Sequence, residues 1–373
     1  MNIINFLLSV GVLSIYGVLF FLALGPKNID LYHTPNSALL SEYDYIVIGG
    51  GSAGSVVSSR LAENGEKVLL LEAGVSDSVD VITMPIGFPQ IFMNPQYQYL
   101  DWGNSAKFEK GSIKKRIAFP RGKVVGGCGS INANIWNIGN HKVYDLWEKK
   151  GAKGWSWSEL KGYFQKAEET LWIEKYPGKY VHEFMKDMND VASKIYGSTE
   201  SFNIKSKGFA FYETTMRNGR RWSSADAYLK PTLRKYPQNL HLRLNSTVDK
   251  ILFNEKADRA VGVLLENKKE FKARKEIILS AGAFNSPTIL MRSGVGDSKK
   301  LQKFGIKTVK EIPGVGEHLQ THPVIGINTI VEHPKWDSIK EEPPKISKII
   351  DYLIFGTGTY TSNIAEFGGY IRK

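Results

Sequence analysis

A short apolar segment followed at once by a glycine-rich turn opens the part of the chain that we expect to fold. Asp44 to Ile48 (DYIVI) has the apolar, β-branched and aromatic content of a buried parallel strand. Residues 49–54 (GGGSAG) fit the pattern G-x-G-x-x-G, residues 55–64 (SVVSSRLAEN) predict a helix, and residues 67–71 (KVLLL) predict a second strand. A strand–turn–helix–strand unit with this glycine spacing is typical of a dinucleotide-binding fold.

Each glycine of the turn has a physical role in such a fold. Gly49 makes the tight turn, Gly51 lets the backbone approach a pyrophosphate, and Gly54 allows the helix to pack closely on the strand. Ser52 and Ala53 lie between these glycines, just before the predicted helix, whose N-terminus would face the phosphates. We therefore predict that these five residues contact a dinucleotide.

An acidic residue closes the second predicted strand. Glu72 follows the glycines by about 20 residues, the spacing at which such folds place the acid that binds the ribose. A carboxylate there can accept hydrogen bonds from both hydroxyls of an adenosine ribose, and it would repel a 2′-phosphate, which argues against NADP. Ala73 shares this strand tip, and we include it in the predicted cofactor site.

A second glycine-rich stretch surrounds the only cysteine of the chain. Gly126 to Trp136 reads GGCGSINANIW and contains Cys128. Its glycines would let the backbone approach a ligand, and the Asn132 side chain offers both a donor and an acceptor. A solvent-exposed turn is an equally good interpretation of these residues by themselves. Because there is one cysteine, no intrachain disulfide can form.

Two long segments add to the first glycine-rich turn. Residues 120–145 read PRGKVVGGCGSINANIWNIGNHKVYD, and residues 280–296 read SAGAFNSPTILMRSGVG. Together these segments resemble the glucose–methanol–choline (GMC) family of FAD-dependent alcohol oxidoreductases, and in particular its glucose dehydrogenases. The first segment matches a family signature at Lys123, Val125, Gly126, Gly127, Gly129, Ile131, Asn132, Trp136, Gly139 and Asp145. The second matches throughout residues 282–296, and residues 314–320 (GVGEHLQ) also look like a family segment.

The resemblance covers residues 43 to the end and implies an α/β fold with FAD as the cofactor. We expect a doubly wound, Rossmann-like FAD-binding domain built from residues 43–155 and 220–305. A second, α+β substrate domain with an antiparallel sheet is expected from residues 156–219 and 306–373, and it is expected to be incomplete.

The family also suggests which residues contact the cofactor. Its first signature runs along the flavin and the pyrophosphate, which implies contacts from Val125, Gly127, Cys128 and Asn132. The residue that matches Val248 contacts adenine through its backbone. Cys128 departs from the family pattern, in which a small hydroxyl residue is usual. We interpret it as a buried apolar substitute rather than a redox-active thiol, since no second cysteine exists.

Residues further along the chain give two more expectations. Residues 241–248 and 250–253 look like a strand pair near the adenine. Residues 364–371 resemble the sheet edge that precedes the family's C-terminal region.

The resemblance implies oxidation of an alcohol or sugar, with a proton passing to a histidine and a hydride to the flavin. Electrons then pass to oxygen or a quinone. The family's histidine and its partner lie in a C-terminal region without a counterpart in this sequence, so we name no catalytic residue. We expect a fragment or a truncated product. A catalytically inactive flavin-binding paralogue remains an alternative, as does an NAD-dependent dehydrogenase, which the first glycine-rich turn alone permits.

Charge and histidine spacing bear on other classes of function. The formal net charge is +12, but the basic residues are scattered, and no basic helix, zinc finger or aromatic RNA-binding motif occurs. We therefore predict no nucleic-acid partner. His318 and His322 have a helical spacing, but Pro323 would end a helix there, so we predict no metal site.

The N-terminus carries the signal for location. Residues 6–24 contain no charged residue, and small residues follow at the spacing that a signal peptidase accepts. We favour a cleaved signal peptide in residues 1–25 over an uncleaved membrane anchor. Either assignment predicts a secreted or membrane-anchored extracellular protein.

Overall fold

The structure is a computed structural model. It describes residues 33–107, 116–174, 181, 183–198, 208–322, 324, 326–327 and 346–371. The uncharged N-terminal segment, residues 6–24, lies outside these ranges. Among the helices in the described part of the chain, none is both long and apolar enough to cross a bilayer.

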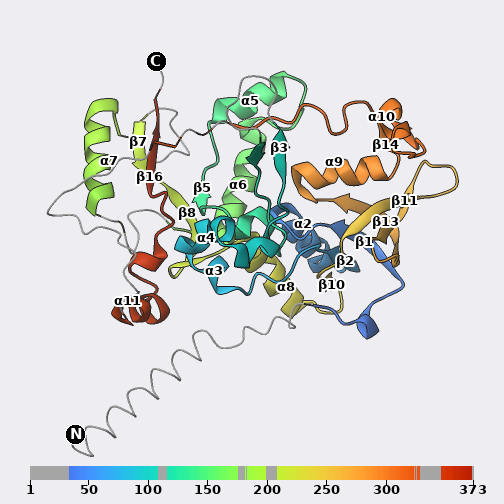
Figure 1. Ribbon diagram of the computed structural model, residues 1–373, viewed down its shortest axis with the longest axis horizontal. Coiled ribbons are helices and arrows are strands. Elements are labelled where there is room, and N and C mark those ends of the chain that lie inside the picture. The colour runs from blue at the N-terminus through green and yellow to red at the C-terminus, as the bar shows by residue number, and fades with distance from the viewer. Residues whose placement is uncertain are drawn as a thin grey trace, which may run out of the picture.

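A six-stranded sheet forms the centre of the larger part of the molecule (Figure 1). Its strand order is β10-β2-β1-β13-β12-β11. The bounds are β1 (Glu42–Ile48), β2 (Val68–Leu71), β10 (Leu240–Arg243), β11 (Val248–Phe253), β12 (Ala260–Leu265) and β13 (Glu270–Leu279). Neighbours among the first four strands are parallel, whereas β12 and β11 join as antiparallel strands. The strands predicted at residues 44–48 and 67–71 are therefore present as β1 and β2.

The expected pairing of the strands around Val248 is wrong. β10 lies at one edge of the sheet beside β2, and β11 lies at the opposite edge beside β12. A short turn makes β12 the local partner of β11. Residues 244–247 instead cross the C-terminal ends of the parallel strands, where the Ser246 N–H donates to the Glu72 carbonyl at 2.9 Å.

Helices cover both faces of the sheet. Side chains alternate along each strand, so Ile46 and Leu69 pack towards Ile289 of α9 (Gly282–Arg292). Val47 and neighbouring apolar side chains face the other way, onto α2 (Ser52–Glu63) and the π-helical turn η6 (Ala225–Leu229), which continues into α8 (Lys230–Lys235). Helices on both faces of a mainly parallel sheet are the doubly wound arrangement that the resemblance predicts, and the fold class is confirmed.

Small antiparallel sheets form the other part, on the left in Figure 1. β8 (Glu213–Arg217) pairs with β5 (Ile135–Trp136), β6 (Ile173–Glu174) and β9 (Arg220–Arg221), and β7 (Gly208–Phe211) pairs with β16 (Phe367–Tyr370). The expected sheet edge at residues 364–371 is thus present as β16. Further helices are α5 (His141–Lys149), α6 (Trp157–Leu171), α7 (Glu183–Tyr196), α11 (Ile346–Ile350) and the π-helical turn η7 (Asp351–Phe355). The domain limits given above stay predictions.

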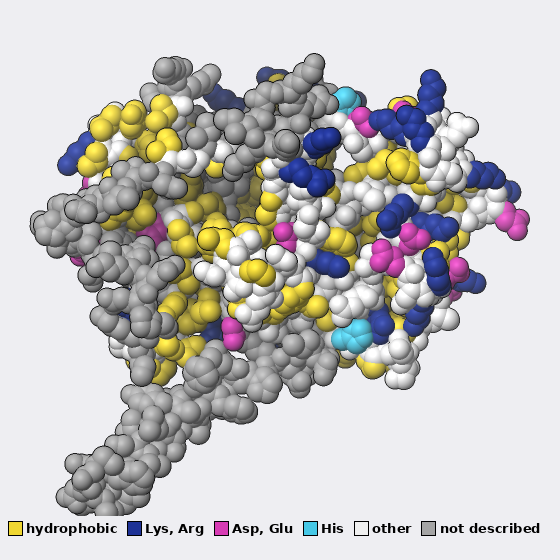
Figure 2. Space-filling view, viewed as in Figure 1, with side chains coloured by type: hydrophobic (Ala, Val, Ile, Leu, Met, Phe, Trp, Pro, Cys, Tyr) yellow, Lys and Arg dark blue, Asp and Glu magenta, His cyan; other side chains and the backbone are white. Residues whose placement is uncertain are grey.

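Shorter elements complete the chain. The strands are β3 (Ser105–Lys107), β4 (Arg116–Ala118), β14 (Val295–Gly296) and β15 (Lys310–Glu311), and the α-helices are α3 (Asp80–Thr83), α4 (Phe88–Met93) and α10 (Ser298–Gln302). The 3₁₀ turns are η2 (Asn36–Ala38), η3 (Pro85–Gly87), η4 (Pro95–Leu100), η5 (Gly127–Ser130) and η8 (Thr359–Thr361). In Figure 2, charged side chains crowd the side built on the six-stranded sheet, whereas hydrophobic side chains are more exposed near α7.

Candidate cofactor site

A cavity of about 540 Å³ opens where β1, β2 and β13 end. Its walls come from these strand ends, from the first turns of α2 and α9, and from the segment that crosses between β10 and β11. In open α/β sheets, ligands bind in the crevice at the carboxyl ends of the strands. Both helices begin at this cavity, so the positive ends of two helix dipoles face it.

The structure gathers most of the predicted site residues around this cavity. Those that line it are Gly49, Gly51, Ser52, Ala53, Glu72, Ala73, Gly127, Cys128 and Val248. Gly54, Val125 and Asn132 do not line it. These three residues instead hold the two glycine-rich turns in place.

Gly54 and Val125 are packing residues. A Cβ on Gly54 would lie 1.9 Å from the Gly49 carbonyl oxygen, so this glycine sets how closely α2 approaches the turn. Val125 is buried against the α2 face of the sheet. Its N–H donates to the Val75 carbonyl at 2.9 Å, and its carbonyl accepts from Ser130 Oγ at 2.6 Å. Its backbone groups are therefore already used within the protein.

The two glycine-rich turns cross at Gly51 and Gly127. Gly127 has φ +55°, and a Cβ there would lie 2.8 Å from Gly51 Cα. A Cβ on Gly51, by contrast, would have Gly127 Cα at 3.8 Å as its nearest neighbour. The space in front of Gly51 is therefore open to the cavity, as expected for a backbone that a phosphate approaches.

Glu72 connects the first turn to the loop after β2. Its side chain is 5% exposed. One carboxylate oxygen accepts from the Gly50 N–H at 2.7 Å, and the other accepts from the Gly74 N–H at 2.8 Å. Burial raises the pKa of Glu72 to about 7, although the two backbone N–H groups partly oppose this shift. The acid therefore fixes the cavity wall as well as facing the predicted ribose position.

The raised pKa of Glu72 predicts a pH dependence of stability in the cofactor-free protein. In the unfolded chain Glu72 ionises near 4.5, and in the folded protein near 7, so its contribution to the free energy of unfolding falls as pH rises through that window. Glu72→Gln should remove this component. Urea unfolding of both proteins at several pH values measures this component. If the free energy of unfolding changed with pH equally in wild type and variant, the assignment would be contradicted.

Cys128 is exposed, so its interpretation as a buried apolar substitute is wrong. Residues Gly127 to Ser130 form the 3₁₀ turn η5, in which Gly127 and Ser130 are buried. The same turn places the Cys128 side chain outward, on the cavity wall. The direction of the Cys128 side chain depends on this 3₁₀ turn, and the residue types alone did not predict the turn.

Arg221 holds the second turn and was missed in the sequence. Its side chain is buried, and burial lowers its pKa to about 10. Its guanidinium donates to the carbonyl oxygens of Ile82 at 2.9 Å and Asn132 at 2.7 Å, and to the Asn132 side-chain oxygen at 2.9 Å. Asn132 is therefore a partner of Arg221, exposed beside the turn rather than on the cavity wall. Its partners lie far along the chain, so no local sequence pattern pointed to Arg221.

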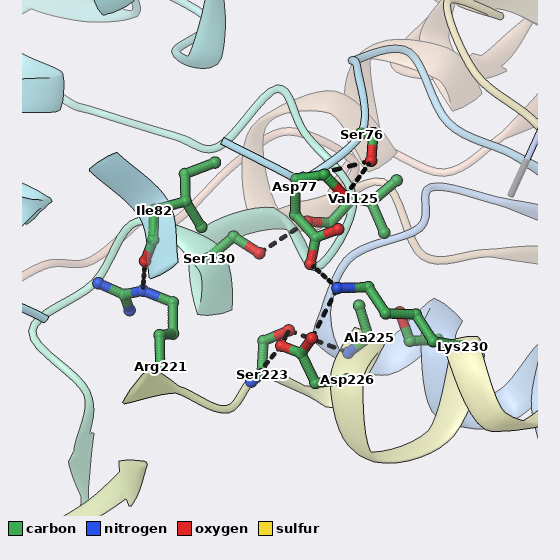
Figure 3. Close-up of polar contacts among 12 residues, drawn as sticks. Ser76, Asp77, Ile82, Val125, Ser130, Arg221, Ser223, Ala225, Asp226 and Lys230 are labelled. Atoms are coloured by element: carbon green, nitrogen blue, oxygen red, sulfur yellow. Dashed lines mark hydrogen bonds and ion pairs between the residues drawn. The ribbon is translucent and has the colours of Figure 1, made fainter. Parts of the chain in front are cut away.

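A buried ion cluster anchors the loop after β2 (Figure 3). Lys230 Nζ lies 2.7 Å from Asp77 Oδ2 and 2.6 Å from Asp226 Oδ1. Burial opposes the charge on Lys230, but attraction to both carboxylates outweighs it and raises the Lys230 pKa. For Asp77, burial and the nearby Asp226 outweigh Lys230 and raise the pKa to about 6. The cluster joins the loop that carries Gly74 to the start of α8.

No histidine in the described ranges lines the cavity; those present there are His33, His141, His241, His318 and His322. His318 and His322 are exposed. Within the same ranges, no cluster of three or more His, Cys, Asp or Glu side chains could hold a metal ion.

The residues present fit a dinucleotide. Open space at Gly51 and two helix N-termini suit a pyrophosphate, and the acid at the tip of β2 suits a ribose. These features together define a dinucleotide-binding α/β protein.

Comparison with known proteins identifies the family. The family model described as GMC oxidoreductase matches residues 43–324, and the chain belongs to this family, whose members bind FAD. The chain is 35% identical over 355 residues to the oxygen-dependent choline dehydrogenase of Brucella anthropi, covering 89% of this chain and 62% of that protein. It is 35% identical over 343 residues to the glucose dehydrogenase [FAD, quinone] of Drosophila pseudoobscura, covering 85% and 53%.

Solved structures agree with the fold. The formate oxidase of Aspergillus oryzae superimposes with a TM-score of 0.71 at 23% identity, covering 89% of this chain and 62% of that chain. The chain thus spans less than two thirds of the length of the relatives and structures that it matches here. The resemblance to the GMC family is confirmed.

Proposed function

We propose that this chain is the FAD-binding portion of an oxidoreductase that acts on the CH–OH group of an alcohol or a sugar. The observation that carries the proposal is the cavity at the strand ends, with Gly51 open to it and Glu72 on its wall. The names of the relatives give choline and glucose as donors and oxygen and quinone as acceptors for those proteins. They support the reaction class without selecting one substrate.

The residues of this chain would bind and orient the cofactor. The N–H groups at Ser52 and Ala53 would face the pyrophosphate, Glu72 would accept from the ribose hydroxyls, and the backbone at Val248 would meet the adenine. Bound FAD supplies a hydride acceptor for alcohol oxidation. Arg221 and Asn132 would keep the second glycine-rich turn in place.

The single cysteine gives a direct test of where FAD binds. Cys128 is exposed on the cavity wall, so FAD should cover it and slow its alkylation by iodoacetamide by about tenfold or more, as expected for a site occupied at ten times Kd or above. Mass spectrometry of the labelled chain measures the rate. NAD at the same concentration should protect less. Stronger protection by NAD would favour the NAD-dependent dehydrogenase instead.

The reaction itself is tested by reduction of bound flavin. The FAD-loaded chain, co-expressed with the portion of the Brucella choline dehydrogenase that it does not match, should lose its yellow colour anaerobically when an alcohol or sugar is added. The chain expressed alone is the control. We expect its flavin to be reduced slowly, because no histidine of the described ranges lines the cofactor cavity and general-base catalysis typically contributes 10²–10⁴-fold. If no donor reduces the flavin in the complemented protein, a flavin-binding module without catalysis becomes the better proposal.

The uncharged residues 6–24 support a secreted or membrane-anchored location for this protein.

A further inference from the structure

A second cavity, of about 850 Å³, lies among β9, η6 and η7, outside the cofactor site. Basic side chains dominate its wall: Arg217, Arg220, Arg221, Lys230 and Arg234 line it together with the acidic Asp77 and Asp226. Its volume is in the range of small-molecule sites rather than macromolecular interfaces.

Two of the basic side chains already have protein partners. Lys230 binds both carboxylates of the cavity wall, as Figure 3 shows. Arg221 donates to carbonyl oxygens and to the Asn132 side chain. The wall has five basic and two acidic side chains, so its formal net charge is 5 − 2 = +3.

Within the part of the chain that the structure describes, the guanidinium groups of Arg217, Arg220 and Arg234 have no hydrogen-bond or ion-pair partner. The guanidinium of Arg217 stacks on Trp172 and Trp222, with its Cζ 4.6 Å and 4.8 Å from the ring centroids. Stacking fixes the plane of a guanidinium and leaves its N–H donors at the edge unused. Three guanidinium groups without a carboxylate partner in one cavity create a positive potential that favours an anion.

Part of the cavity wall is apolar. Ile354 and Phe355 of η7 line the cavity and are 52% and 62% exposed. Exposed apolar side chains next to unpaired arginines suit a ligand with an apolar body and an anionic head. An inorganic ion alone would leave this wall in contact with water.

We propose that this cavity binds a small organic anion. Its phosphate or carboxylate head contacts Arg217 and Arg220, with Arg234 at the rim, and its apolar body packs on Ile354 and Phe355. Guanidinium groups bind such heads through paired, charge-assisted hydrogen bonds. The site lies beside Arg221, the side chain that holds the second glycine-rich turn, but it shares none of the cofactor contacts.

The test uses the FAD-loaded chain, so that the cofactor site is filled. Calorimetric titration at physiological ionic strength with phenyl phosphate should show one saturable site per chain. Arg217→Gln and Arg220→Gln should each weaken binding by roughly tenfold, the effect of one lost charge-assisted interaction. Arg116→Gln, which removes an exposed arginine of β4 outside the cavity, should bind as wild type does.

Several outcomes would overturn the proposal. These are no saturable binding, displacement of FAD by phenyl phosphate, or equal weakening by Arg116→Gln and Arg220→Gln, which would indicate general charge attraction. Arg217 and Arg220 are half-buried, so their variants could fail to fold; Arg234→Gln then tests the proposal, because Arg234 is exposed. Wild-type affinity for phenyl phosphate in Arg234→Gln would contradict the contact of Arg234 with the anion. Inorganic phosphate that binds as tightly as phenyl phosphate would refute the role of Ile354 and Phe355.

Discussion

A purified Gly127→Val variant should contain no bound flavin. Gly127 has φ +55°, and its missing Cβ would lie 2.8 Å from the backbone of Gly51. A β-branched residue at such a φ costs about 1–3 kcal/mol. The overpacking adds about 1–3 kcal/mol, so the total of about 2 kcal/mol or more should lower FAD affinity by roughly 30-fold or more. The visible absorption of the purified protein measures the loss.

The cause of this loss is the crossing of the two turns rather than a side chain in the space of the cofactor. Gly162→Val is the matched control, because Gly162 lies within α6 and a Cβ there would meet nothing within 4 Å. It should retain full colour. A yellow Gly127→Val protein would show that the turn can move aside, and the assigned position of this glycine in the site would then be wrong.

Replacing Lys230 by methionine should lower the free energy of unfolding by about 3–5 kcal/mol, the usual effect of removing one partner from a buried ion pair. Asp77 is 3% exposed and would lose its counter-charge while Asp226 remains nearby. Urea unfolding of the wild type and the variant measures the difference. FAD retention should also fall, because the loop after β2 carries the Gly74 N–H that binds Glu72.

The Lys230→Met deficit should depend on pH. Lys230 lowers the pKa of Asp77, so without it the carboxyl takes up a proton more readily as the solution becomes acidic. The difference from wild type should therefore be smaller at about pH 5 than at about pH 8. Lys303→Met, a change at an exposed lysine, is the control and should be nearly neutral. A Lys230→Met protein as stable as this control would contradict the role of the cluster.

The cofactor cavity could be predicted where its determinants are local. The turn at residues 49–54, the following helix and Glu72 form one continuous unit, so glycine spacing and apolar content were enough to place them together. Contacts that depend on partners far along the chain were not predicted. Arg221 reaches the carbonyl of Ile82, and Lys230 reaches Asp77, across separations that carry no periodic signal.

The sequence by itself determined the β1–α2–β2 unit, because backbone conformation at glycine and the burial pattern of side chains act over a few residues. The family and its cofactor came from the resemblance of residues 120–145 and 280–296 to the GMC signatures. The tertiary structure decided that β10 and β11 lie at opposite edges of the sheet and that the Cys128 side chain faces the cavity. It also decided that Val125 and Asn132 support the turn instead of lining the cavity. These outcomes depend on which distant groups satisfy buried donors and acceptors, and only the folded chain brings those groups together.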